Sequence, residues 1–390
     1  MTPTDEGPSR GRPPHIGIVV QRFGEQIVGG AEAHARMVAL ALAPRARVTV
    51  ITSCATETET WTNRLPAGTE RDGPLTVRRL AASLPRFGRL HKAVEVSVRR
   101  GFGDARPLGR LFATLQGPVL PGLSDAITGG GFDRLILFTY LYAPTITAAR
   151  VCRGRALPFD FVPTAHDEPA LRFTAMQESF RFASRIAFNT DAEADLVRRR
   201  VPGLRAPSQV VGCGTDRPEV LPKGPLSTGQ TLPAQYVLYL GRDKPGVELL
   251  TGVTRGPVPL VTGGAVTVPG ALNLGRVSSD DKWRLLSGAL AIVQPSRYES
   301  LGLTLIEAWQ CGRPVVVTRA CDVLSTQVAL SGGGLIADDG PSLATAVARL
   351  ADSPTDAATL GAAGGVFAER YTWPTIADYF LAPFARGETP

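Results

Sequence analysis

The sequence predicts an α/β protein with two domains, each built around a parallel β-sheet. The chain has 390 residues, more than one domain usually holds, and 44% of them are hydrophobic, which is enough for two cores. Short β-branched runs alternate with helical patterns, as they do in α/β folds. A stretch rich in proline and glycine, 218–233, suits a linker between the two halves.

These signals set the expected domain boundaries. The first residues are polar and proline-rich and lack the apolar core of a signal peptide, so we expect a disordered tail there. The expected parts are a tail over 1–13, a first domain over 14–215, a second domain over 216–372, and a terminal helix with a tail over 373–390.

In the first half, apolar runs predict strands that alternate with helices. The strand His15–Gln21 precedes Gly29 and Gly30, which open a helix through about Leu42. Paired glycines at a helix start let a ligand approach the backbone, although G-x-G-x-x-G is absent. Further strands are expected over 47–52, 75–80, 132–139, 161–168 and 185–190, and helices over 89–98, 144–152 and 192–200, the last with Asp191 as its N-cap.

In the second half, the segment Ala291–Thr318 has the clearest secondary-structure pattern. A buried strand ends at Pro295, a polar loop follows, and a helix over Gly302–Cys311 is stopped by Gly312. This strand–loop–helix–strand order is the unit of a parallel sheet. Other strands are expected over 236–240, 259–264, 272–277 and 332–336, and helices over 279–286, 342–350, 355–371 and 373–384.

Two glutamates flank the start of that helix, with Glu299 just before it and Glu307 inside it. The free N–H groups around Leu301–Thr304 would point toward an anion, helped by the helix dipole. Carboxylates there would repel a phosphate, but they accept hydrogen bonds from hydroxyls. A sugar nucleotide has both parts, a diphosphate and sugar hydroxyls. The alternative is an ordinary αβ unit with solvated glutamates.

The segment Glu299-Ser-Leu-Gly-Leu-Thr-Leu-Ile-Glu307 resembles the E-x7-E element of retaining glycosyltransferases with the GT-B fold, especially family four. The resemblance implies two Rossmann-like domains facing across a cleft, with a C-terminal helix that crosses back to the first domain. It implies that Glu299 faces the donor sugar and that Glu307 binds the nucleotide ribose. The remaining donor-binding candidates at this helix start are Ser300, Leu301, Gly302 and Leu303.

The same resemblance assigns cations to the diphosphate. In Gly241-Arg242-Asp243-Lys244-Pro245-Gly246, Arg242 would grip phosphate oxygens in pairs and Lys244 would add a point charge. Both would stabilise the leaving diphosphate. The family usually has more residues between the arginine and the lysine, which makes the assignment of Lys244 less secure. The alternative is an exposed turn of charges.

Further candidates lie on other predicted strands. The resemblance places Gly29 and Gly30 against the donor diphosphate, and Val277 where the backbone meets the base. His166 ends the predicted strand Phe161–Glu168, at the edge where open α/β sheets place ligands. The family carries a histidine there facing the donor sugar, although a lone histidine is more often structural.

Missing motifs narrow the chemistry. No D-x-D element, no Walker glycine–lysine loop and no G-x-S-x-G elbow occurs. The five cysteines are widely spaced, without C-x-x-C, which fits a reducing cytosol and no metal site. We therefore expect no cofactor and no metal, with cations and the helix N-terminus taking the place of a divalent ion. No run of about 18 apolar residues suggests a transmembrane helix.

The net charge of +7 is concentrated in one segment, Arg78–Arg110. Its nine basic residues stand against two acidic ones, so the rest of the chain is about balanced. Such a segment can attract an anionic membrane or an anionic acceptor, or it can be an arginine-rich solvated face. Nucleic acid is a poorer fit, because aromatics are few. We expect a cytoplasmic protein with peripheral contact at the inner membrane face.

Together these features predict a retaining glycosyltransferase that moves a sugar from a nucleotide-diphosphate sugar to an acceptor hydroxyl. The acceptor could be lipid-linked, a natural product or a polysaccharide. No residue stands out as a covalent nucleophile, so same-face displacement is the preferred mechanism. The alternatives are a nucleotide-sugar epimerase, a sugar phosphorylase, or a non-catalytic subunit that binds sugar nucleotides.

Overall fold

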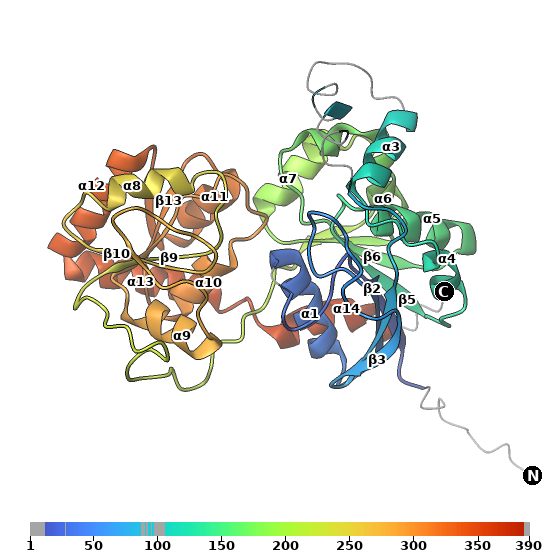
Figure 1. Ribbon diagram of the computed structural model, residues 1–390, viewed down its shortest axis with the longest axis horizontal. Coiled ribbons are helices and arrows are strands. Elements are labelled where there is room, and N and C mark those ends of the chain that lie inside the picture. The colour runs from blue at the N-terminus through green and yellow to red at the C-terminus, as the bar shows by residue number, and fades with distance from the viewer. Residues whose placement is uncertain are drawn as a thin grey trace, which may run out of the picture. The chain divides into compact units, whose positions relative to one another are not determined.

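The computed structural model describes residues 12–385 except 28, 87–89, 91–92, 95 and 97–105, and only the backbone of 106 and 107. The chain divides into two compact units. The first extends to Ala187, resumes over Arg198–Gln209 and includes the chain from Ala377; the second comprises Phe188–Val197 and Val210–Ile376. Both units are α/β, and each contains one mainly parallel sheet, as predicted (Figure 1).

The first unit has an eight-stranded sheet in the order β3-β4-β2-β1-β5-β6-β7-β8. The central strands β1 and β5 are buried along their whole length, which explains their continuous apolar sequences. At one edge β3 pairs antiparallel with β4 and forms a hairpin. The strands are β1 His15–Val19, β2 Arg47–Ser53, β3 Gly68–Asp72, β4 Leu75–Leu80, β5 Arg134–Phe138, β6 Phe159–Val162, β7 Arg185–Phe188 and β8 Ser208–Val210.

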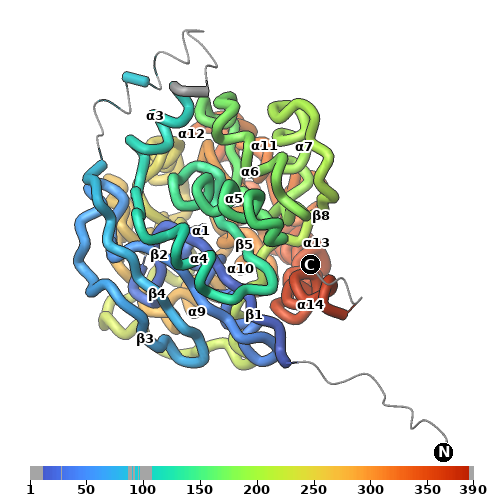
Figure 2. Tube along the Cα trace, turned by 90° about the vertical axis from the view of Figure 1, so that its right-hand side faces the viewer, coloured from blue at the N-terminus to red at the C-terminus, as the bar shows by residue number. Residues whose placement is uncertain are grey.

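Helices connect these strands and cover the sheet, as the trace in Figure 2 shows for α3, α4 and α5. The expected Asp191 N-cap is wrong: Asp191 is the first helical residue, and the Glu193 amide donates to Thr190 Oγ1 at 3.1 Å, so Thr190 caps the helix. The expected helix over 89–98 falls largely outside the described residues. The helices are α1 Gly30–Leu42, α3 Arg106–Gln116, α4 Leu123–Thr128, α5 Ala143–Arg155, α6 Thr174–Phe182 and, each divided between the two units, α7 Asp191–Arg200 and α14 Trp373–Ala385.

The second unit has a six-stranded sheet, β11-β10-β9-β12-β13-β14, with parallel pairing throughout. Its core includes Trp283 and Trp309, and the Trp309 indole donates to the Gly333 carbonyl at 2.8 Å. The strands are β9 Val237–Leu240, β10 Leu260–Gly263, β11 Leu272–Asn273, β12 Ala291–Gln294, β13 Val315–Thr318 and β14 Gly334–Ala337. The helices are α8 Leu250–Val253, α9 Ser279–Gly288, α10 Leu303–Gln310, α11 Asp322–Ser331, α12 Gly340–Asp352 and α13 Pro354–Ala368.

A buried carboxylate links three strands of the first unit. Asp160 on β6 is fully buried and pairs with Arg134 on β5 at 2.8 Å and with Arg185 on β7 at 2.5 Å. Arg185 also donates to the Tyr379 carbonyl on α14 at 3.1 Å and stacks over its ring. One aspartate therefore pairs with two arginines at the sheet, and one of these, Arg185, also contacts the terminal helix.

We expect Asp160→Ala to lower the free energy of unfolding by about 3–5 kcal/mol, because it removes the buried carboxylate with which Arg134 and Arg185 are paired. Urea unfolding monitored by circular dichroism measures the change. Asp378→Ala is the matched control: its partner Arg45 is exposed and lies 2.7 Å away, so the loss should be about 0–1 kcal/mol. Equal losses in the two variants would contradict the role given to Asp160.

Candidate active site

The candidate site of the second unit lies at the carboxyl edge of its sheet, where parallel sheets usually bind ligands. The loop after β9 runs over 241–246, and the loop after β12 runs over 295–302. Because β9 and β12 are neighbours in the sheet, the two loops meet. This geometry brings Lys244 and Glu299 together, although the sequence separates them by 55 residues.

Close backbone packing joins these two loops. Gly246 has φ +107°, and a Cβ there would lie 2.1 Å from the Pro295 carbonyl oxygen, so only glycine fits. The Arg297 amide donates to the Pro245 carbonyl at 3.0 Å. Gly246 therefore has a structural role, which is to hold the loop after β9 against the loop that carries Glu299.

Lys244 and Glu299 form an ion pair whose side chains are 23% and 18% exposed. Gln294, at the end of β12, donates to the same oxygen, Glu299 Oε1, at 3.2 Å, and also to Ser296 Oγ at 3.1 Å. Among the described residues, no hydrogen bond is recorded for Glu299 Oε2. One carboxylate oxygen is thus fixed by the protein, and the other remains available for a hydroxyl donor.

The start of α10 is held in place from outside the helix. Gly302 is the N-cap residue in the left-handed region, and it makes no side-chain capping hydrogen bond. Ser300 accepts from Asn189 Nδ2 at 3.2 Å and from Thr190 Oγ1 at 3.3 Å, and Gln327 donates to the Leu301 carbonyl. The Leu305 amide donates to the Gly302 carbonyl at 2.9 Å, so an anion at this helix start would meet the amides that precede Leu305.

The side chains at this helix start do not all face outward. Leu301 belongs to the hydrophobic core and Leu303 packs against it, so these two residues can offer only backbone groups to a ligand. Ser300 has its hydroxyl and its carbonyl engaged with the Asn189–Thr190 turn. The prediction of backbone binding over 300–303 stays a prediction, with Asn189, Thr190 and Gln327 added as residues that position the loop.

Glu307 has a partner that the sequence did not suggest. Lys282 on α9 lies 2.6 Å from Glu307 Oε1, and it also lies over the Trp283 ring at 4.7 Å. Burial raises the pKa of Glu307, whereas Lys282 acts in the opposite direction. Lys282 lies in the first turn of α9 beside Asp280 and Asp281, and only the tertiary structure brings it to Glu307.

Arg242 and Val277 lie at the same edge of the sheet. The Arg242 guanidinium is exposed, and no partner is recorded for it in the described part of the chain, while its carbonyl accepts from Tyr239 Oη at 2.8 Å. Backbone bonds tie the neighbouring loops: Asp243 donates to Ala265 at 2.9 Å and Gly264 to Gly275 at 2.6 Å. The loops after β9, β10 and β11 thus form one hydrogen-bonded rim that carries Arg242 and Val277.

In the first unit, Gly29 precedes α1 and Gly30 is its first residue, as predicted. A Cβ at Gly29 would lie 2.1 Å from Glu32 Oε2, whereas Gly30 has open space beside it. Glu32 forms a buried pair with Arg22 through two bonds of 2.6 and 2.9 Å. Gly29 is therefore explained by this ion pair, and Gly30 is the position that a ligand could approach.

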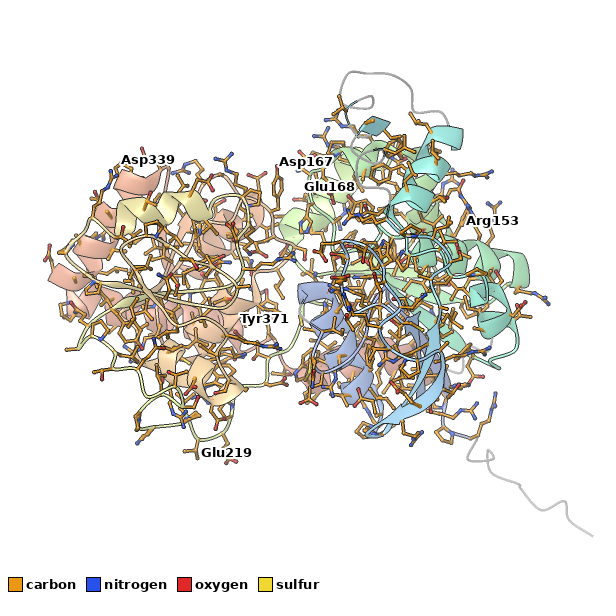
Figure 3. All side chains as sticks on the ribbon, viewed as in Figure 1. Arg153, Asp167, Glu168, Glu219, Asp339 and Tyr371 are labelled. Atoms are coloured by element: carbon orange, nitrogen blue, oxygen red, sulfur yellow. The ribbon has the colours of Figure 1, made fainter. Side chains whose placement is uncertain are left out.

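His166 lies in the loop after β6, at the carboxyl edge of the first sheet. It is half-buried, and its Nδ1 is buried without a hydrogen bond among the described residues. Nearby, Tyr140 donates to Glu168 Oε1 at 2.6 Å, and Figure 3 labels Asp167 and Glu168 in this loop. A buried ring nitrogen without a partner is consistent with contact to a polar ligand.

The described residues contain neither a metal-binding cluster nor a membrane-spanning helix. Across the part of the chain with described side chains, no group of three or more His, Cys, Asp or Glu residues is placed to hold a metal ion. Within the same residues, no helix is both long and apolar enough to span a bilayer. The five cysteines are free thiols, of which Cys311 alone is only partly buried.

Removing Lys282 should make stability depend on pH through Glu307. In Lys282→Met the pKa of Glu307 should rise further above its unfolded value, so the folded protein holds more protons than the unfolded one. The stability that this extra proton gives is fully present below the pKa of Glu307 in the unfolded state. It is lost as pH rises through the pKa of Glu307 in the folded state. At pH 8 we expect the free energy of unfolding of Lys282→Met to be about 2 kcal/mol lower than that of Lys282→Met/Glu307→Gln. Near pH 4 the two variants should be almost equally stable.

Thermal unfolding of both variants across this pH range measures the difference. A stability gap that is the same at pH 4 and pH 8 would mean that Glu307 does not titrate as described.

Comparisons with known proteins bear on the family and the fold. Residues 272–364, which include Lys282, Glu299 and Glu307, match the family model described as "Glycosyl transferases group 1". A curated relative, D-inositol 3-phosphate glycosyltransferase 2 of Catenulispora acidiphila, is 30% identical over 250 residues, which are 54% of this chain and 58% of that protein. The match thus spans little more than half of the relative's length.

Solved structures match over almost the whole chain. Sucrose-phosphate synthase from Thermosynechococcus elongatus has a TM-score of 0.72 at 19% identity, covering 96% of this chain and 99% of its own. The Anabaena protein HepE in complex with UDP-glucose has a TM-score of 0.67 at 16% identity, covering 95% and 99%. The expected fold is thereby confirmed: the chain has the GT-B fold of two Rossmann-like units, and residues 272–364 match the group 1 glycosyl transferases.

Proposed function

We propose that this protein is a glycosyltransferase that moves a sugar from a nucleotide-diphosphate sugar to an acceptor hydroxyl. The observation that carries the proposal is the pairing of Lys244 with Glu299 beside the uncapped start of α10. Cation, carboxylate and free N–H groups together match the diphosphate and the hydroxyls of a sugar nucleotide. The match of 272–364 to group 1 glycosyl transferases supports the same reaction class.

Each residue takes a role that follows from its surroundings. Arg242 and Lys244 bind the diphosphate and stabilise it as it leaves. Glu299 accepts hydrogen bonds from the donor sugar through its unengaged oxygen, and Glu307 accepts them from the ribose diol. When the donor binds, the Lys244 ammonium exchanges part of its contact with Glu299 for a phosphate oxygen, which keeps the ion paired throughout.

Retention of configuration is part of the proposal. A same-face displacement needs no enzyme nucleophile, because a leaving phosphate oxygen accepts the proton of the acceptor hydroxyl while the new glycosidic bond forms. In the first unit, Gly30 and the unsatisfied Nδ1 of His166 are the groups proposed to meet the donor. HepE, a structural neighbour, is described in complex with UDP-glucose, which makes UDP-sugars the first donors to test.

The acceptor and the cellular location are also proposals. The name of the Catenulispora relative makes a phosphorylated polyol a reasonable acceptor, beside lipid-linked, natural-product and polysaccharide acceptors. Five free thiols favour the reducing cytoplasm. We also propose that the Arg78–Arg110 segment contacts an anionic membrane, but with fewer arginines than its sequence suggests. The Arg79 side chain is buried and donates to Phe23 and Glu70, so it is not available to a membrane.

A donor screen tests the proposed function. The protein is incubated with UDP-, GDP-, ADP- and dTDP-sugars, with and without candidate acceptors, and products are identified by mass spectrometry. Transfer that requires an acceptor supports the glycosyltransferase. A sugar isomer formed from the donor alone would indicate an epimerase, sugar 1-phosphate formed with inorganic phosphate would indicate a phosphorylase, and no binding of any donor would overturn the proposal.

With the donor known, Arg242→Gln and Glu299→Gln should each lower kcat/KM about 30- to 150-fold, because each removes a charge-assisted contact worth about 2–3 kcal/mol. Steady-state rates of product formation measure this loss in kcat/KM. Arg297→Gln is the matched control, since this arginine lies in the same loop but pairs with Glu248 at 3.3 Å on an exposed face. Its kcat/KM should change less than about threefold. Unchanged turnover in Arg242→Gln would count against the assignment.

Because fixed cations take the place of a divalent ion in this proposal, turnover should continue in excess chelator. Activity is measured after dialysis against EDTA and again after Mg²⁺ or Mn²⁺ is returned. We expect less than a twofold difference, and a strict requirement for either metal would refute this part of the mechanism.

A further inference from the structure

A positively charged cavity lies in the first unit, between α3, α5 and α6. These three helices contact one another and lie side by side in Figures 1 and 2. The cavity has a volume of about 630 Å³, and its charged lining consists of Arg110, Arg150, Arg153, Arg181 and Glu178. Four arginines against one glutamate leave a net charge of +3 in this cavity.

Contacts within the unit hold three of the arginines in place. The Arg153 guanidinium stacks over the Phe182 ring at 4.2 Å, and Arg181 Nη2 donates to Gln177 Oε1 at 2.8 Å. Arg150 Nε donates to Glu178 Oε2 at 2.9 Å, so the single carboxylate of the cavity is already engaged. The guanidinium groups are thus oriented before any ligand arrives, which lowers the entropy cost of binding one.

This cavity is separate from the candidate donor groups of the same unit. Arg153 lies in the last turn of α5, before β6 begins, and Phe182 ends α6, before β7 begins. Both therefore lie near the amino ends of the strands, whereas His166 follows the carboxyl end of β6. In Figure 3, Arg153 and Glu168 lie on opposite sides of this unit. A group bound in the cavity is not the diphosphate of the donor.

We propose that this arginine cavity binds a phosphate group. Guanidinium forks match the oxygens of a phosphate in bidentate fashion, and a phosphate monoester carries close to two negative charges, which suits a net charge of +3. The phosphate can come from a lipid headgroup at a membrane surface or from a soluble phosphate compound. The proposal does not depend on the glycosyltransferase reaction.

The test uses the full chain, with wild type compared with Arg153→Gln/Arg181→Gln. One arm measures sedimentation with phosphatidylcholine vesicles, with or without phosphatidic acid, at low salt. The other measures thermal stabilisation by inorganic phosphate against chloride of equal ionic strength. The matched control is Arg205→Gln/Arg349→Gln, which removes the same charge at exposed positions outside the cavity. Circular dichroism verifies that both double variants are folded.

We expect the cavity variant to bind at least about tenfold more weakly than wild type and the control variant. Loss of vesicle binding alone identifies a lipid headgroup, and loss of stabilisation by inorganic phosphate identifies a soluble phosphate. Two results would overturn the proposal. One is no binding by wild type in either arm. The other is an equal loss in both double variants, which would show that binding follows net charge and not this cavity.

Discussion

The arrangement of the site depends on one close approach, that of Gly246 to the Pro295 carbonyl. Any side chain at position 246 would separate the loop after β9 from the loop after β12. Because the two backbones touch, Lys244 reaches Glu299, and Gln294 bonds the same carboxylate oxygen. A lysine and a glutamate from distant parts of the chain are thereby held in one partly buried position without a ligand.

This pairing resolves the conflict of placing carboxylates beside a phosphate site. Glu299 is balanced by Lys244, Glu307 is balanced by Lys282, and Arg242 remains as an additional cation. Among these five side chains, three cations stand against two carboxylates, and the N–H groups at the start of α10 add partial positive charge. An anion can therefore approach although two acids are present, and the acids can meet hydroxyl groups.

The sequence predicted those features that have local causes. Buried strands such as β1, β5 and β12 are continuous apolar runs, and α10 is bounded by glycines, so both kinds of element were predicted near their observed positions. By contrast β3 is largely exposed and has no apolar pattern, and it was missed. Lys282, Asn189 and Thr190 act through tertiary contacts, which no spacing in the sequence reveals. Arg79 was counted as a surface charge but is buried, for the same reason.

The pair of Lys282 and Glu307 determines what kind of ligand group can bind beside Glu307 in the candidate site. A carboxylate accepts hydrogen bonds from two hydroxyls, whereas a protonated carboxyl group must also donate one. Burial pushes Glu307 toward the protonated form, and the nearby charge of Asp216 pushes it in the same direction. Lys282 opposes both and favours the ionised form. The lysine on α9 therefore favours the state in which Glu307 accepts hydrogen bonds, which the proposed contact with a ribose diol would require.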